Sequence, residues 1–314
     1  MTAQPPVIRI LAGVAGRSLA FMIGMTSGAV EALSARLATA QRSSSVTPQP
    51  IVLGVSAGAF AAAVVAMGIN GSEARRLAAD FPEVDVLGKR SLRGFLTKRE
   101  LYPDAQLRRL ADAIVGDRTF ADFALPRELS GLAPRGLASA LIIPVYSATH
   151  GTLLLPRDLP KLGFDDLPVA DVLVAATRFP GALPAAAGLE DLFDGGLQYR
   201  VPHEVFAPDP ALILEMSTPE PHNSRGGLVF PLMHPALPVI TDRPRPYNYP
   251  TVRDSTIFGN LPYGSAMKPP AQTTVQQFDR GYVVAQTWIR SRTHDQLRAL
   301  GIPTAAPVGD RRAG

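Results

Sequence analysis

Residues 51–69 constrain the fold more than any other segment, because they are almost wholly apolar yet change character in the middle. They open with the β-branched run Ile-Val-Leu-Gly-Val, pass through Ser-Ala-Gly at 56–58, and continue as an alanine-rich run. β-Branched residues favour strands, whereas alanine is the strongest helix former. The segment therefore predicts a buried strand, a tight turn and a buried helix. The alternative is one membrane-spanning helix, which needs about 20 consecutive apolar residues.

A second unit of the same kind comes earlier in the chain. Residues 7–11, Val-Ile-Arg-Ile-Leu, have the pattern of a short strand, and a glycine-bearing turn and an apolar helix over residues 18–39 follow it. Two successive strand–turn–helix units are typical of a parallel sheet covered by helices. We therefore predict an α/β fold of three layers, with a mainly parallel central sheet between helices, and a single domain over residues 1–314.

The rest of the chain is expected to complete this domain. Residues 73–137 are more polar and have a helical pattern, so they form an excursion from the sheet. Strands are expected at 140–146, 152–155 and 211–216, whereas at 169–177 periodicity does not distinguish a helix from a strand. Residues 206–314 supply a proline-rich lid over 231–250 and a C-terminal helix that begins at residue 271 and ends at Gly301 and Pro303.

Composition and charge exclude several classes of site. The chain contains no cysteine, so disulfides and thiolate sites are impossible, which suits a reducing, cytoplasmic compartment. The apolar stretch at 19–30 lacks the cleavage region of an export signal. The net charge is +4, and a local basic cluster is compatible with peripheral binding to an anionic membrane surface or with an anionic substrate, although most such clusters are solvated faces. The chain has no motif for nucleic-acid binding. The cluster consists of Lys89, Arg90, Arg93, Lys98 and Arg99.

Residues 54–58, Gly-Val-Ser-Ala-Gly, match the G-x-S-x-G nucleophile elbow. They lie between the predicted strand and the predicted helix, as that motif requires. A sharp strand-to-helix turn holds the serine in a strained backbone and projects its hydroxyl outward, while Gly54 and Gly58 let neighbouring backbone pass without a clash. Ser56 is therefore the candidate nucleophile, and a plain helix-entry turn is the alternative interpretation.

A serine nucleophile needs a base. An α/β-hydrolase would place an acid and then a histidine after the serine, but such enzymes build several strands before the elbow, and one strand fits before residue 51 here. No local motif supports any of the five histidines. His203 lies closest in sequence to Asp194 and stays open as a catalytic substitute. The histidines are His150, His203, His222, His234 and His294.

Three blocks, in order along the chain, resemble the signature of patatin-like phospholipases. They are Gly-Val-Ala-Gly-Arg at 13–17, Gly-Val-Ser-Ala-Gly at 54–58 and Asp-Gly-Gly at 194–196. Further similarity at 119–123, 175–184 and 199–202 extends the resemblance over residues 7–205. The resemblance implies a patatin-like fold and hydrolysis of acyl esters in lipids, with phospholipids as the first expectation. It implies no metal and no organic cofactor.

The resemblance also implies a catalytic dyad, in which Ser56 attacks the ester carbonyl and Asp194 removes the serine proton. Arg17 and Arg178 are candidate substrate contacts; Arg178 stands where the family usually has a small residue, and it either points outward or brings a cation near the phosphate or carboxylate of the substrate. The substrate would be a lipid at a membrane surface, and a homo-oligomer is compatible with the sequence. Backbone N–H groups of the glycine-bearing turn would form the oxyanion hole. The turn residues are Gly13, Val14, Ala15 and Gly16.

The first block departs from the family pattern. Val14 and Ala15 stand where members carry more glycine, and Ser18 occupies the position of a further glycine. This departure keeps open a catalytically silent lipid-binding or regulatory module on the same fold. Residues 13–18 also allow a phosphate-loop interpretation, because a glycine-rich turn before a helix binds anions, but they lack the Gly-Lys-Ser/Thr ending. For residues 194–196, a plain β-turn is the alternative.

Overall fold

The structure is a computed structural model of the chain. It describes residues 7–40, 49–98, 100–103, 105–131, 133–134, 136–197, 203–207, 209–216, 256–259 and 272–302. The expected proline-rich lid at 231–250 and the similarity block at 199–202 lie outside the described residues.

The described strands form one seven-stranded sheet, in which the order is β4-β3-β2-β1-β6-β7 and β5 also pairs with β3. The contacts β1–β2, β1–β6, β2–β3 and β6–β7 are parallel, whereas β4 and β5 run antiparallel to β3. The prediction of a mainly parallel sheet is therefore confirmed. The strands are β1 Val7–Ala12, β2 Gln49–Gly54, β3 Leu141–Ser147, β4 Gly151–Leu155, β5 Leu192–Asp194, β6 Leu212–Met216 and β7 Thr256–Gly259.

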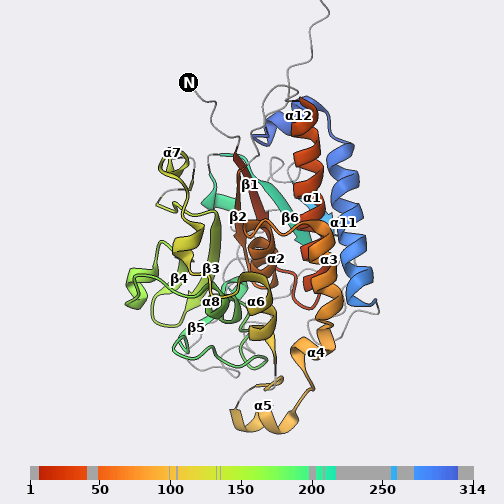
Figure 1. Cartoon of the computed structure of the whole chain (residues 1–314). Coiled ribbons are helices and arrows are strands. Elements are labelled where there is room, and N and C mark those ends of the chain that lie inside the picture. The colour runs from red at the N-terminus through yellow and green to blue at the C-terminus, as the bar shows by residue number, and fades with distance from the viewer. Residues whose placement is uncertain are drawn as a thin grey trace, which may run out of the picture.

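Helices cover the sheet, as expected for the α/β class. The longer helices are α1 Leu19–Ala40, α2 Ala57–Ala66, α3 Gly71–Asp80, α6 Leu107–Val115, α8 Val169–Ala176 and α11 Thr274–Arg290. The shorter ones are α4 Glu83–Leu87, α5 Leu92–Lys98, α7 Arg127–Ser130 and α12 His294–Ala299, with 3₁₀ turns η1 Phe120–Phe123, η2 Leu159–Leu162, η3 Gly195–Leu197 and η4 His203–Val205. Figure 1 shows α1 and α11 side by side on one flank of the molecule, with α2 against the sheet.

The two faces of the sheet bury different partners. Side chains such as Ile10 and Val52 point to the face where α1, α2, α6, α8 and α11 form the larger core cluster. Leu11 and Leu53, their neighbours in sequence, point to the opposite face, because side chains alternate along a strand. That face is covered in part by Leu129 of α7. The sheet therefore lies between a thick helical layer and a thinner one among the described residues.

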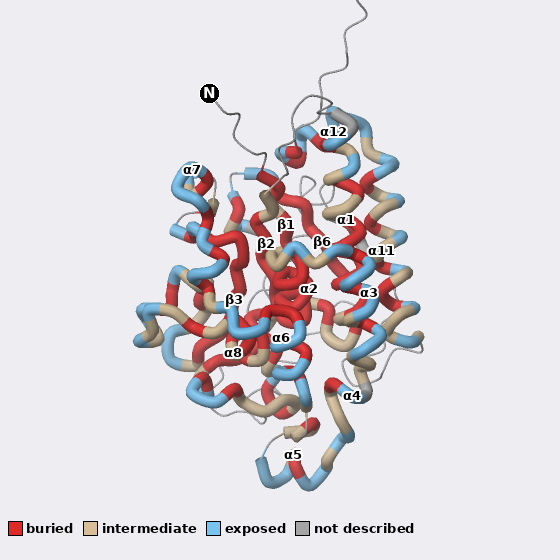
Figure 2. The backbone as a smooth tube through the Cα atoms, in the orientation of Figure 1, coloured by how far each residue is buried: buried red, intermediate tan, exposed pale blue. Residues whose placement is uncertain are grey.

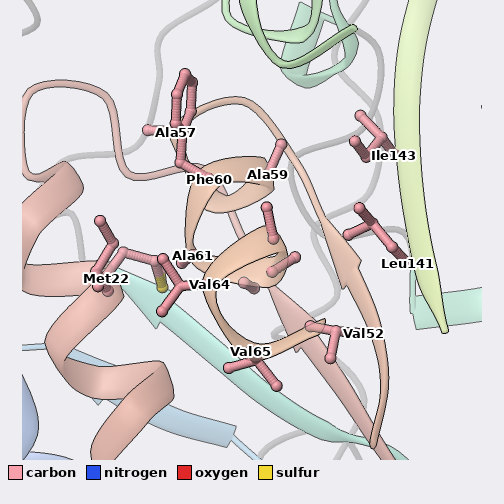
Figure 3. Packing of buried hydrophobic residues seen from close by; sticks show 14 of the residues in the cluster. Met22, Val52, Ala57, Ala59, Phe60, Ala61, Val64, Val65, Leu141 and Ile143 are labelled. Carbon is pink, nitrogen blue, oxygen red and sulfur yellow. The ribbon is translucent and has the colours of Figure 1, made fainter. Parts of the chain in front are cut away.

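Helix α2 lies at the centre of the thick layer. Its residues from Ala57 to Val65 are all buried, and Figure 2 shows it enclosed by other buried chain. In Figure 3, Phe60 and Val64 of this helix lie among buried side chains that include Met22, Val52 and Ile143. Residues 51–69 thus form the strand and buried helix that the sequence predicted. No helix in the described part of the chain has both the length and the apolar character needed to span a membrane.

Two expectations about secondary structure need correction or completion. The C-terminal helix does not run unbroken to residue 301, because α11 ends at Arg290 and α12 begins at His294. Thr293 caps the start of α12. Its side-chain oxygen accepts a hydrogen bond from the Gln296 N–H, and the side-chain oxygen of Gln296 accepts one from the Thr293 N–H. Strand β7 was not predicted at all. The ambiguous segment 169–177 is the helix α8.

Candidate active site

The turn between β2 and α2 holds Ser56 in the backbone geometry of a nucleophile elbow. Its φ of 57° and ψ of −132° make it the one non-glycine residue with positive φ among those that the structure describes. Such a conformation costs about 1–3 kcal/mol and persists only where the surroundings enforce it. Here close packing does so, since a Cβ on Gly58 would lie 2.4 Å from the carbonyl oxygens of Ala12 and Gly13. A Cβ on Gly54 would lie 2.3 Å from the Gly58 oxygen.

Strand β5 brings the third block to this turn. Strand β4 occupies one edge of β3 over residues 143–147, so β2 and β5 share the other edge, β2 at residues 141–142 and β5 at residues 145–147. Strand β5 therefore begins to pair where β2 has ended, at the position of the elbow. Asp194, paired with Val145, is the last residue of β5 and faces Ser56 across 138 residues of sequence.

The Ser56 hydroxyl donates a hydrogen bond to the Asp194 carboxylate, with 2.5 Å between Oγ and Oδ2. Both residues are buried, each with 5% of its surface exposed. The other carboxylate oxygen, Oδ1, accepts the N–H of Gly196 at 2.7 Å. A serine and an acid therefore contact each other directly at the carboxyl end of β2, as the family resemblance implied.

Burial raises the pKa of Asp194 to about 6 from its ordinary value of 3.8. Loss of water is the larger influence, because it disfavours the charged form. The hydrogen bonds from Ser56 and from the Gly196 N–H act in the opposite direction and lower the pKa. The carboxylate is therefore ionised at neutral pH, and it is more basic than an exposed aspartate, as a general base requires.

The glycine-bearing turn after β1 lies against the same site. A Cβ on Gly196 would lie 2.8 Å from Cγ2 of Val14 and 2.9 Å from the Asp194 carboxylate, so Gly196 packs closely against both the turn and the acid. Gly16 has a φ of 51°, which favours glycine at that position. Gly13 needs a correction: its N–H donates to the carbonyl of Leu214 at 2.9 Å and extends the sheet, so it does not point at a substrate.

The remaining N–H groups of the turn differ from that of Gly13 in their hydrogen bonding. Those of Val14, Ala15 and Gly16 make no hydrogen bond to another described residue. The same holds for Ala57, the first residue of α2, whose N–H follows the nucleophile directly. Such N–H groups at a helix start have no partner within the helix. The sequence analysis did not include Ala57 among the candidate oxyanion donors, although its place directly after the elbow serine was a sufficient signal.

Both candidate arginines form contacts within the protein. Arg17 donates from Nε to Glu83 of α4, and both side chains are largely buried, with exposed fractions of 12% and 18%. Burial raises the pKa of Glu83, an effect that Arg17 opposes. This ion pair anchors the end of the glycine-bearing turn to the helical excursion. The substrate contact expected of Arg17 stays a prediction.

Arg178 binds the strand that carries the acid. Its Nη1 donates to the carbonyl oxygens of Glu190 at 2.5 Å and Leu192 at 3.2 Å, and its guanidinium lies 4.3 Å from the ring centroid of Phe193. Its own carbonyl accepts the N–H of Asp194 at 3.0 Å. Arg178 thus contacts β5 from both main chain and side chain, and the substrate contact expected of it stays a prediction.

The other candidates lie away from the dyad or outside the described residues. Asp191 accepts hydrogen bonds from Ser147 and Thr149, so it stabilises the β3–β4 turn. His150 and His294 are exposed, in that turn and at the start of α12. The side chains of His203, His222 and His234 are not described. Within the described ranges, no three His, Asp or Glu side chains gather as a metal site.

Comparison with known proteins identifies the family. The family model for "Patatin-like phospholipase" matches residues 24–207, which include Ser56 and Asp194 and begin after the glycine-bearing turn. A search of curated proteins returned no match. Two solved structures of the ExoU–SpcU complex from the type III secretion system of Pseudomonas aeruginosa match this chain, at 15% and 14% identity and TM-scores of 0.43 and 0.42.

Each alignment covers 95% of this chain but 53% or 57% of the other, so the chain spans about half the length of the solved chains it matches. The family model covers more than half of the present sequence. The chain therefore belongs to the patatin-like phospholipase family.

Proposed function

We propose that this protein hydrolyses the acyl esters of phospholipids through a dyad of Ser56 and Asp194. Membership of the family indicates lipid acyl hydrolysis in general. The observation that carries the finer proposal is the 2.5 Å hydrogen bond from the Ser56 hydroxyl to the buried Asp194 carboxylate. A nucleophile and its base within hydrogen-bond distance are the minimum requirement for covalent acyl transfer.

In the first half-reaction, Oγ of Ser56 attacks the carbonyl carbon of the ester. Oδ2 of Asp194 takes the hydroxyl proton as the new C–O bond forms. The tetrahedral intermediate then collapses, the bond to the leaving alcohol breaks, and the alcohol oxygen takes the proton back from Asp194. The products are the free alcohol and an acyl group on Ser56.

In the second half-reaction, water takes the place of the alcohol. Asp194 removes a proton from the water, the hydroxide attacks the acyl carbon, and collapse of the intermediate returns the proton to Oγ of Ser56. The fatty acid leaves. A single carboxylate serves both halves because it is ionised at neutral pH yet more basic than an exposed aspartate, with a pKa of about 6.

Backbone N–H groups stabilise the oxyanion that forms in each half-reaction. The donors are the Ala57 N–H at the start of α2 and an N–H of the turn over residues 14–16, since these groups make no hydrogen bond to another described residue. Ala57 lies at the positive end of the α2 dipole. One such donor contributes about 3 kcal/mol to catalysis. Val14 and Ala15 do not weaken this proposal, because an oxyanion hole uses main-chain groups.

The experiment is release of fatty acid from a mixed phospholipid extract, followed by mass spectrometry of the products. Wild-type protein should release fatty acid, and Ser56→Ala should abolish release while preserving the fold. Ser130→Ala is a matched control, because that serine lies in α7 and its hydroxyl donates to the Arg127 carbonyl. A wild-type protein that binds lipid but releases no fatty acid would favour the catalytically silent module instead. Release from triacylglycerol alone would refute the phospholipid substrate.

A further inference from the structure

Four large apolar side chains stand exposed in the described part of the chain, and two of them lie together on α5. Leu92 and Leu96 expose 71% and 72% of their surface, and they are one helical turn apart, so they share a face. The other two are Phe179, at 36%, and Val283 of α11, at 60%. Figure 1 shows α5 projecting at the end of the molecule toward which β1 runs, and Figure 2 shows it largely exposed.

The packing of α5 explains why its leucines point to solvent. Gly94, on the inner side of the helix, lies against the returning chain, where a Cβ would meet the Glu100 oxygen at 2.8 Å and the Pro103 ring at 3.0 Å. The Ser91 N–H donates to the Leu101 carbonyl at 2.8 Å and closes the loop. The helix is therefore held by its glycine side, and its leucine side faces outward.

Positive charge surrounds these leucines. Residues 89–98 contain two lysines, two arginines and no acidic residue. Lys89, Arg90, Arg93 and Lys98 are all exposed, and Arg90 also donates to the Tyr102 hydroxyl at 2.9 Å. An exposed apolar pair beside several cations has the chemistry of a segment that inserts at an anionic lipid surface: apolar side chains enter the interface, and cations contact the headgroups.

The α5 loop is joined to the candidate active site by a short chain of backbone hydrogen bonds. The N–H groups of Leu101 and Tyr102 donate to the carbonyls of Gly181 and Ala182, at 3.0 and 2.8 Å. The same segment carries the Arg178 carbonyl, which accepts the Asp194 N–H. It also carries the exposed Phe179. The loop that bears α5 therefore flanks the strand of the proposed base, at the end of the sheet where an ester would enter.

We propose that α5 docks the protein on an anionic phospholipid bilayer through Leu92 and Leu96, with Lys89, Arg93 and Lys98 on the headgroups. The biological role of this docking surface depends on the proposed function, because docking would present lipid to the dyad. Its physical basis is independent of catalysis, since none of the five side chains contacts Ser56 or Asp194 in the structure.

The test is co-sedimentation with vesicles of phosphatidylcholine and phosphatidylserine, performed on the Ser56→Ala background so that hydrolysis does not alter the vesicles. The double variant Leu92→Ser/Leu96→Ser should reduce binding about tenfold or more, because two apolar side chains no longer enter the interface. Lys89→Gln/Arg93→Gln should reduce it by about tenfold. Added salt and vesicles of phosphatidylcholine alone should have a similar effect.

Matched controls exist on α11. Val283→Ser removes another exposed apolar side chain, and Arg290→Gln removes another exposed cation, so both should bind vesicles as the parent does. With Ser56 restored, the leucine variant should hydrolyse a soluble short-chain ester at the wild-type rate but a vesicle lipid about tenfold more slowly. Both α5 leucines are exposed, so the variants should fold normally.

Equal vesicle binding by the α5 and α11 variants would overturn the proposal, and so would binding that ignores anionic lipid. Binding to a protein partner through Leu92 and Leu96, without vesicle binding, would also overturn it. Failure of the proposed function is distinguishable, because wild-type protein would then hydrolyse neither the soluble ester nor the vesicle lipid. The sedimentation result would still decide the docking surface.

Discussion

Replacement of Asp194 by asparagine separates a catalytic base from a turn former. An asparagine at this position keeps the shape of the side chain, and its oxygen can accept the Gly196 N–H that now donates to Oδ1 at 2.7 Å. Its amide nitrogen can donate to Oγ of Ser56, which lies 2.5 Å from Oδ2 in the structure. The substitution therefore preserves both contacts but removes the group that accepts the serine proton.

Activity should fall by about two to four orders of magnitude, the usual effect of losing a general base. For the wild type, kcat/KM should rise with pH along an acid limb centred near the Asp194 pKa of about 6, because the base acts in its ionised form. The residual activity of Asp194→Asn should lack this limb. Both quantities come from hydrolysis of a soluble ester across a pH series.

The free energy of unfolding of Asp194→Asn should exceed that of the wild type, although its activity falls. The folded protein keeps the Asp194 proton up to a pKa of about 6, whereas the unfolded chain releases it near 3.8, so wild-type stability falls as pH rises through this range. Two pH units correspond to about 3 kcal/mol in the free energy of unfolding. Asparagine stays neutral, so the variant should gain up to about 3 kcal/mol relative to wild type between about pH 4 and about pH 8.

Urea denaturation of both proteins at about pH 4 and at about pH 8 measures this difference in the free energy of unfolding, and ester kinetics on the same samples measures activity. Retention of most activity by Asp194→Asn would refute the role of Asp194 as base. A difference in stability that does not change with pH would refute the burial argument, even if activity fell. Asp191→Asn is a control for the kinetics, since Asp191 binds Ser147 and Thr149 in the β3–β4 turn and not Ser56.

Three further outcomes follow from the same geometry. Gly196→Ala should lower kcat by about a hundredfold in ester kinetics, because its Cβ must displace Val14 or the Asp194 carboxylate, and a soluble protein with wild-type kcat would contradict this. Arg178→Ala should cost about 1–3 kcal/mol in urea denaturation and lower kcat more than it raises KM, with partial recovery in Arg178→Lys; unchanged kcat would exclude a positioning role. Chelators should leave ester hydrolysis intact, and a loss that zinc restores would contradict the metal-free mechanism.

The sequence predicted those parts of the fold in which the residues clearly prefer either a strand or a helix. The strand, elbow and helix of residues 51–69 were predicted because the change from β-branched residues to alanine favours a strand followed by a helix. Strand β7 was missed, because it is four residues long and pairs with β6 through main-chain groups that carry no sequence pattern. The break between α11 and α12 depends on the side chain of Thr293, which a helical periodicity does not register.

The candidate site was predictable at its nucleophile and less so around it. The G-x-S-x-G motif identified Ser56 and the family resemblance identified Asp194, but their contact depends on β5 pairing with the edge of β3 beyond β2, a tertiary feature that no local pattern encodes. The oxyanion donors were assigned by position along the turn, so Gly13 was included although its N–H extends the sheet to Leu214. The roles of Arg17 and Arg178 follow from partners far away in sequence or on the main chain.

The most direct measurement of the central claim is labelling with a fluorophosphonate, followed by mass spectrometry of the digested protein. The account predicts one phosphonylated residue, Ser56, with labelling abolished in Ser56→Ala and slowed by about two to four orders of magnitude in Asp194→Asn. Labelling at another serine, such as Ser27 inside α1, or equally fast labelling of the Asp194→Asn protein, would contradict the dyad.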